Sequence, residues 1–154
     1  MSQNYVLVTD SACDLGIERA REWGIEMIRI PFLFTDDGVG HSDLDQPLHE
    51  FYTQMRDGRV AKTSAVNEDM YFRTFTPILE QGKDILYLAF SSGLSVTAEN
   101  SRKVAAALSE QYPERTIRVI DSLGASGGEG LFVYLAKQNL DAGLTLEENA
   151  KKLE

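Results

Sequence analysis

The sequence predicts an α/β fold with a mainly parallel sheet and helices on both of its faces. Short apolar runs rich in β-branched residues alternate with longer segments whose apolar residues recur at helical spacing, as in strands joined by crossover helices. Three of the short runs end in polar pairs, at Asp10-Ser11, Ser91-Ser92 and Asp121-Ser122. Ligands of open parallel sheets bind beyond the carboxyl ends of the strands, so we expect a binding site at this edge.

The first part of the chain predicts two strands and a helix between them. Residues 5–9 read Tyr-Val-Leu-Val-Thr, a composition that favours a central strand. A helix is expected from Asp14 to Trp23, because Gly24 follows it as a helix-ending residue. Residues 27–34 predict a second strand. Pro31 within it indicates an edge position or an irregularity, because proline cannot donate to the ladder.

The next part of the chain predicts a loop, a connector and two helices. Residues 35–45 are polar and contain glycine, which is typical of a loop. Pro47 stands where a helix start tolerates proline, and residues 61–66 are expected to form an extended connector. Asn67 offers a cap for a helix that ends near Gly82. Three apolar residues at helical spacing form the expected core stripe of that helix: Tyr71, Phe75 and Ile78.

The stretch of residues 85–95 carries the clearest functional signal. Its first part, residues 85–90, is a short apolar run that predicts a buried strand, and a turn of small residues then leads into a helical segment. Such a geometry aims backbone N–H groups at one point, where the partial positive charge of a helix start favours an anion. The hydroxyls of Ser92 and Ser95 add donors. We therefore expect an anionic head group here, although both serines could instead simply cap the helix.

The last part of the chain predicts a further strand and two helices. Residues 116–120 are rich in β-branched residues and predict the strand. Ser126 and Glu129 have capping-box spacing at the start of the first helix, and Thr145 and Glu148 have the same spacing at the start of the second.

Charge and composition exclude several classes of function. The 154 residues carry a net charge of −9, which repels phosphate backbones, so we expect no nucleic-acid partner. We expect no membrane span, because no apolar run is long enough. We also expect no signal peptide, because the first residues lack a basic segment followed by a long apolar stretch. The one cysteine, Cys13, cannot form an internal disulfide, which favours a reducing compartment and a cytoplasmic location.

Four short motifs occur in order along the chain. They are Val8-Thr9-Asp10-Ser11, Lys62-Thr63-Ser64, Ser91-Ser92-Gly93-Leu94-Ser95 followed by Thr97, and Ile120-Asp121-Ser122 followed by a glycine cluster. In order and spacing the motifs resemble those of the DegV family, over essentially the whole chain. The resemblance implies a bacterial fatty-acid-binding protein, without catalysis of its own, that presents the carboxylate of its fatty acid to a separate fatty acid kinase for phosphorylation.

The resemblance also implies which residues hold the ligand. Thr63 and Ser95 stand where the family binds the fatty acid carboxylate, and Ser64, Ser92 and Gly93 stand beside them. Four further residues are expected to have structural roles next to the site: Asp10, Ser11, Asp121 and Ser122. The resemblance implies no metal, no catalytic residue and no cofactor, with fatty acid as the bound ligand.

Two features depart from the family pattern. The family has glycine after the second serine of the turn, whereas this chain has Val96, whose branched side chain restricts the backbone and narrows the approach. Family members also carry a second domain that holds the acyl chain. We expect residues 1–143 to form the first domain and residues 144–154 to start a helix that leads to an absent second domain. The chain alone should then bind fatty acid weakly or not at all.

Three alternatives to fatty acid binding fit parts of the pattern. A metal-dependent phosphatase-like enzyme would use Asp10, but position 12, where a second aspartate would stand, is Ala12. A serine hydrolase would use Ser95, but residues 92–96 do not form the Gly-x-Ser-x-Gly elbow. A fragment with an uncovered apolar face would associate with itself.

Overall fold

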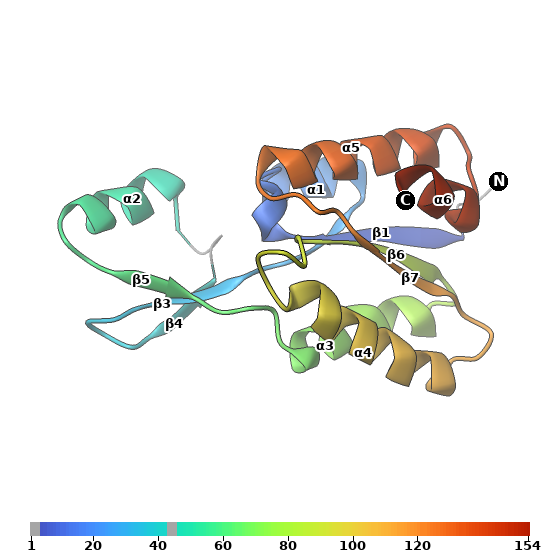
Figure 1. Cartoon of the computed structure of the whole chain (residues 1–154), viewed down its shortest axis with the longest axis horizontal. Coiled ribbons are helices and arrows are strands. Elements are labelled where there is room, and N and C mark those ends of the chain that lie inside the picture. The colour runs from blue at the N-terminus through green and yellow to red at the C-terminus, as the bar shows by residue number, and fades with distance from the viewer. Residues whose placement is uncertain (1–3, 43–45) are drawn as a thin grey trace.

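A four-stranded parallel sheet forms the middle layer of the larger part of the structure (Figure 1). The computed structural model describes residues 4–42 and 46–154, so expectations for residues 1–3 and 43–45 lie outside the described residues. The strand order is β2-β1-β6-β7. The bounds of these strands are Tyr5–Asp10 for β1, Glu26–Ile28 for β2, Asp84–Ala89 for β6 and Ile117–Asp121 for β7.

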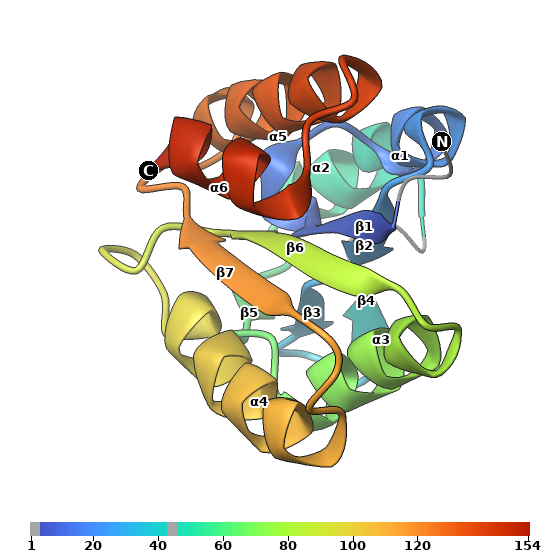
Figure 2. The ribbon, with the colours of Figure 1, turned by 90° about the vertical axis from the view of Figure 1, so that its right-hand side faces the viewer.

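Helices cover both faces of the parallel sheet, which confirms the expected fold class (Figure 2). One face carries three helices: α1 (Ile17–Trp23), α5 (Gly127–Asp141) and α6 (Leu146–Leu153). The other face carries two: α3 (Glu68–Glu80) and α4 (Thr97–Gln111). Each face has its own apolar cluster, and neighbours along β6 divide between them, with Leu86 on the first face and Tyr87 on the second. Within the described ranges, none of the helices has the length and apolar character needed to span a bilayer.

A smaller unit projects beyond the carboxyl edge of the parallel sheet (Figure 1). It contains an antiparallel sheet in the order β4-β3-β5 and one helix. The bounds of these elements are Pro31–Phe34 for β3, Gly40–Ser42 for β4, Ala61–Thr63 for β5 and Leu48–Arg56 for α2. The loop expected over residues 35–45 is therefore wrong where β4 lies, and the connector expected over residues 61–66 begins with a paired strand.

The single strand expected over residues 27–34 is wrong, because the chain changes sheets within it. Strand β2 ends at Ile28, and Pro31 then begins β3. Between them, the N–H of Ile30 donates to the hydroxyl Oγ of Ser11 over 2.9 Å instead of to a strand. A proline is tolerated at the first residue of a strand, so the irregularity expected at Pro31 is the point where the chain passes from one sheet to the other.

The start of α3 follows the sequence closely. The side chain of Asn67 accepts a hydrogen bond from the N–H of Met70 over 3.0 Å, as an N-cap residue does. The expected stripe of Tyr71, Phe75 and Ile78 is buried. The cap and the stripe of this helix are therefore both confirmed.

Replacing Asn67 with alanine is expected to lower the free energy of unfolding by about 1 kcal/mol, because the N–H of Met70 loses its acceptor. Asn67→Asp keeps an acceptor and should stay close to the wild type. Urea unfolding of the three proteins measures the difference. Wild-type stability in Asn67→Ala would show that the cap contributes nothing.

The other predicted helix starts are partly wrong. Thr145 and Glu148 form the expected capping box. Ser126 does not cap α5, because its backbone has a φ of 53° and its hydroxyl donates to Asp14 instead, over 2.6 Å. Glu129, its expected partner, is buried. Helix α1 begins at Ile17 rather than near Asp14, where a 3₁₀ turn, η1 (Ser11–Cys13), ends.

Candidate functional site

A cavity of about 400 Å³ lies where the smaller unit meets the carboxyl edge of the parallel sheet. Its wall combines hydroxyl-bearing and apolar residues: Thr63, Ser64, Ser95, Thr97, Ala12, Ile30, Ala65, Phe90 and Leu94. They come from η1, from the link between β2 and β3, from the end of β5 and from the turn between β6 and α4. The structure thus brings Thr63, Ser64 and Ser95 around one space. Their contact with a ligand stays a prediction.

Strand β5 positions the first two hydroxyls. Thr63, its last residue, pairs with Phe32 of β3. The N–H of Ser64 donates to the carbonyl of Pro31 over 3.0 Å, which extends the antiparallel pairing by one residue. Thr63 and Ser64 are both exposed, so a ligand that enters from solvent can reach their hydroxyls.

The turn after β6 positions the third hydroxyl. The N–H of Ser95 donates to the carbonyl of Ser91 over 3.1 Å. The hydroxyl Oγ of Ser95 accepts a hydrogen bond from the N–H of Thr97 over 3.2 Å and lies 2.8 Å from the hydroxyl Oγ1 of Thr97. Ser95 therefore satisfies the first N–H of α4 and lines the cavity at the same time. The capping interpretation and the binding interpretation are compatible for this residue.

Ser92 and Gly93 lie outside the lining of this cavity. The N–H of Ser92 donates to Oδ1 of Asp121 over 3.2 Å, and the N–H of Gly93 donates to the hydroxyl of Ser91 over 3.2 Å. Burial opposes ionisation of Asp121, but hydrogen bonds from Ser92 and from the N–H of Leu123 outweigh it and hold the pKa of Asp121 below its usual value. Ser92 and Asp121 thus join the ends of β6 and β7.

The polar pairs at the strand ends hold backbone in place. Both oxygens of Asp10 accept hydrogen bonds from cavity-wall backbone, Oδ1 from the N–H of Ala12 and Oδ2 from the N–H of Phe90, each over 3.1 Å. Ser11 holds Ile30, another residue of the wall, as described above. The hydroxyl of Ser122 contacts the backbone N–H of Gly124 over 3.2 Å. The pairs therefore hold backbone groups, and their role beside a ligand stays a prediction.

The family model described as "Uncharacterised protein, DegV family" matches residues 4–154. This chain belongs to the DegV family. The resemblance carried by the four motifs is therefore confirmed, and the match includes every predicted site residue.

The relatives of this DegV chain include fatty-acid-binding proteins. A DegV domain-containing protein of Clostridium perfringens is 33% identical over 147 residues, which cover 95% of this chain and 50% of the relative. A stearic acid-binding protein of Eubacterium ventriosum is 26% identical and superposes with a TM-score of 0.88, over 97% of this chain and 52% of the other. A DegV family protein of Thermus thermophilus, solved in a study of its fatty acid binding, is 27% identical with a TM-score of 0.82, over 98% and 52%. The chain spans about half the length of these relatives.

The departure from the DegV pattern at Val96 does not close the cavity. Val96 has a φ of −78°, a conformation that any residue adopts. Its side chain is 54% exposed, and Val96 is not among the residues of the cavity wall. The freedom of glycine is therefore not needed at this position, and the branched side chain lies outside the lining of the cavity.

The sequence did not indicate the apolar part of the cavity wall. Ile30, Phe90 and Leu94 line it beside the hydroxyls. The sequence places Ile30 and Phe90 inside predicted strands, which favours core packing. In the structure each residue lies just beyond the carboxyl end of its strand, because β2 ends at Ile28 and β6 at Ala89. Leu94 is 69% exposed and carries the only signal available from sequence, an apolar residue within a turn of serines.

The cavity wall has no charged side chain among its described residues. Any anion is therefore held by hydroxyl and backbone donors against a net charge of −9. Within the described ranges, His, Cys, Asp and Glu side chains do not gather in groups of three or more that suit a metal ion. A larger hollow of about 720 Å³ lies at the amino ends of the strands, beside Tyr5 and Asp84, and includes none of the predicted site residues.

Proposed function

We propose that this chain binds the head group of a fatty acid in the cavity between Thr63 and Ser95. The observation that carries the proposal is the meeting of both hydroxyls, from motifs about thirty residues apart, around one uncharged cavity of about 400 Å³. Ser64 lines the same cavity and is a further candidate donor. Because Ser92 and Gly93 are engaged elsewhere, the proposal does not rely on them. The relatives named for fatty acid or stearic acid binding support this ligand class.

The physical chemistry of the cavity suits a fatty acid. Burial of an acyl chain contributes about 0.8 kcal/mol per methylene, so the tail can supply most of the affinity. The head group needs only enough donors to offset its loss of hydration. Ile30, Phe90 and Leu94 offer apolar surface directly beside the hydroxyls. Hydroxyl donors also leave carboxylate oxygens open to a reaction partner.

We further propose that the bound carboxylate is presented to a fatty acid kinase and that this chain contributes no catalytic residue. The exposed rim at Thr63 and Ser64 supports the first part, because a partner protein can approach it from solvent. The relatives are about twice as long as this chain, and we propose that a second domain supplies most of the acyl pocket. Residues 144–154 lead toward it in this proposal, with Leu146 and Ala150 of α6 anchored in the core of the present domain.

Removing either hydroxyl is expected to weaken binding of stearic acid by about 10- to 100-fold. A hydrogen bond to a charged group contributes about 1.5–3 kcal/mol, and about 1.4 kcal/mol corresponds to tenfold in affinity. The variants are Thr63→Val and Ser95→Ala. They are made in the protein expressed from the whole gene, and their affinity is measured by titration calorimetry. Matched controls are Thr74→Val and Ser109→Ala, whose hydroxyls bond to helix carbonyls away from the cavity.

Wild-type affinity in the double variant of Thr63 and Ser95 would exclude the proposed head-group site. Mass spectrometry of an organic extract of the purified protein gives an independent check. A full-length protein that carries no fatty acid and takes up none on titration would exclude the ligand class as well.

A further inference from the structure

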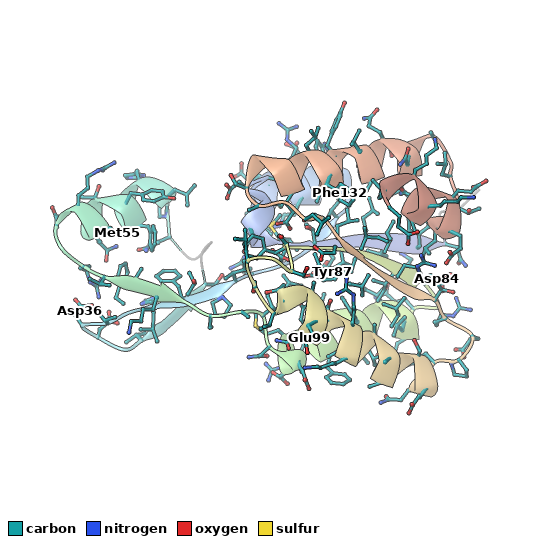
Figure 3. The ribbon with its side chains drawn as sticks, viewed as in Figure 1. Asp36, Met55, Asp84, Tyr87, Glu99 and Phe132 are labelled. Carbon is teal, nitrogen blue, oxygen red and sulfur yellow. The ribbon has the colours of Figure 1, made fainter. Side chains whose placement is uncertain are left out.

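Asp10 lies at one end of a buried chain of hydrogen bonds that runs under the cavity. Asp10 is fully buried, and besides the backbone groups of the wall its Oδ2 accepts the hydroxyl proton of Tyr87 over 2.8 Å. Because Tyr87 donates to Asp10, its hydroxyl oxygen can only accept from Tyr71. The single hydroxyl proton of Tyr71 is shared between that oxygen, 3.0 Å away, and the carbonyl of Thr97, 3.1 Å away. Figure 3 shows Tyr87 at the parallel sheet, between the two helix layers.

The chain of contacts ends at the proposed head-group donor. Thr97 is the first residue of α4, and Ser95 bonds both to its N–H and to its hydroxyl. Tyr71 and Tyr87 have no exposed surface, so their hydroxyls cannot exchange these partners for water. Burial, and then the facing carboxyl of Asp10, raise the pKa of Tyr87 well above its usual value, so it remains a donor. In such a buried network each member restricts the next.

A second carboxyl group supports Asp10 without adding charge. Glu129 is fully buried and its Oε1 lies 3.3 Å from the hydroxyl of Thr9. Burial, and then repulsion from Asp10, raise the pKa of Glu129 to about 9. Glu129 is therefore protonated at neutral pH and can share its proton with Asp10. Its other oxygen, Oε2, is buried and has no hydrogen-bond partner among the described residues.

We propose that Asp10 is a positioning residue for the head-group site, which it orders through Tyr87, Tyr71 and Thr97 so that the hydroxyl of Ser95 faces the cavity. The inference takes its ligand from the proposed function, whereas the hydrogen-bond network is present in the structure without a ligand. The direct contacts of Asp10 to the N–H groups of Ala12 and Phe90 fix two more parts of the same wall. Asp10 thus links the end of β1 to three segments that surround the cavity.

Two conservative variants interrupt the network without emptying the core. Tyr87→Phe and Tyr71→Phe each remove one hydroxyl and keep the ring, and each is expected to weaken stearic acid binding by the full-length protein about tenfold. In a Ser95→Ala background, Tyr87→Phe is expected to change the affinity less than twofold, because its effect passes through Ser95. A tenfold loss in both backgrounds would overturn the proposal, since residues that act independently give additive effects.

The matched control is Tyr5→Phe. Tyr5 is also a buried tyrosine, and its hydroxyl donates to the carbonyl of Leu144 and accepts from Asn149, at the other end of the strands. This variant should lose stability as the others do, while its affinity for stearic acid stays within twofold of the wild type. An equal loss of affinity in Tyr5→Phe would show that the effect comes from a general loss of stability and not from the network, and would overturn the proposal.

Amide hydrogen exchange tests the network without a ligand. In Tyr71→Phe and Tyr87→Phe the N–H of Thr97 is expected to exchange about tenfold faster, and in Tyr5→Phe at the wild-type rate. Unchanged exchange at Thr97 in the first two variants would overturn the inference. If the wild type binds no fatty acid, the proposed function fails, and this exchange result still decides whether Asp10 orders the cavity wall.

Discussion

The protein is expected to lose stability steadily as the pH rises from about 4.5 to about 9, and Glu129→Gln is expected to abolish most of that loss. Burial and the facing Asp10 raise the pKa of Glu129 from 4.5 to about 9. Between these values the folded state holds one proton more than the unfolded state, so the free energy of unfolding falls by about 1.4 kcal/mol per pH unit. The stabilising contribution is complete below the lower value and is lost as the pH passes the upper one.

Three other groups with shifted pKa values, Cys13, Tyr87 and Glu148, titrate outside this window. Burial raises the pKa of Cys13 to about 11 and that of Tyr87 well above its usual value, so both remain protonated. Backbone and side-chain hydrogen bonds from Thr145 lower the pKa of Glu148 below 4.5, so its contribution is lost only in more acidic solution. A slope between pH 5 and pH 9 that disappears in Glu129→Gln therefore reports Glu129.

Urea unfolding at a series of pH values measures this effect. Glutamine can still donate to Asp10 and accept from Thr9, so the variant should fold, and by pH 9 it should be several kcal/mol more stable than the wild type, on the order of the loss it avoids. Glu148→Gln, an exposed glutamate with the same substitution, should keep the wild-type slope. Parallel curves for the wild type and Glu129→Gln would show that Glu129 is ionised in the folded protein.

Much of this fold can be predicted from the sequence because its signals are local. The apolar runs that became β1 and β6 have the length and composition of buried strands, and Asn67 and Thr145 cap helices as their neighbours suggest. The smaller unit could not be predicted in the same way. Its strands β4 and β5 have three residues each, and their pairing with β3 is set by contacts such as Phe32 with Thr63, far apart in the sequence.

The network under the cavity was missed for two different reasons. The bond between Asp10 and Tyr87 joins residues separated by 77 positions, and no local pattern encodes it. Glu129 did leave a signal: it stands on the helical period of Val133 and Ala136, which are buried on the same face of α5. A capping-box pattern with Ser126 predicted a role at the helix start instead. The two patterns conflict, and tertiary packing decides in favour of the helical period.

Gly130→Ala is expected to destabilise the protein by about 3 kcal/mol, because small-to-large changes in a tightly packed place force the backbone to move. A Cβ atom at position 130 would lie 2.5 Å from the carbonyl oxygen of Cys13. The atom it meets belongs to the backbone of η1, so no side-chain rotation can relieve the contact. Gly128→Ala is the matched control: a Cβ there has nothing within 4 Å, and alanine should stabilise the helix by about 0.5–1 kcal/mol.

The same clash should reach the binding site. Gly130 keeps α5 close to η1, and η1 contains Ala12, a residue of the cavity wall whose N–H bonds to Asp10. When η1 shifts to make room for a methyl group, the cavity changes shape even in molecules that remain folded. Titration with stearic acid under conditions where Gly130→Ala is fully folded should therefore show weaker binding, and Gly128→Ala should bind as the wild type does. Wild-type stability of Gly130→Ala would contradict this prediction. It would mean that α5 and η1 can separate enough to accommodate a Cβ atom that otherwise lies 2.5 Å from the carbonyl oxygen of Cys13.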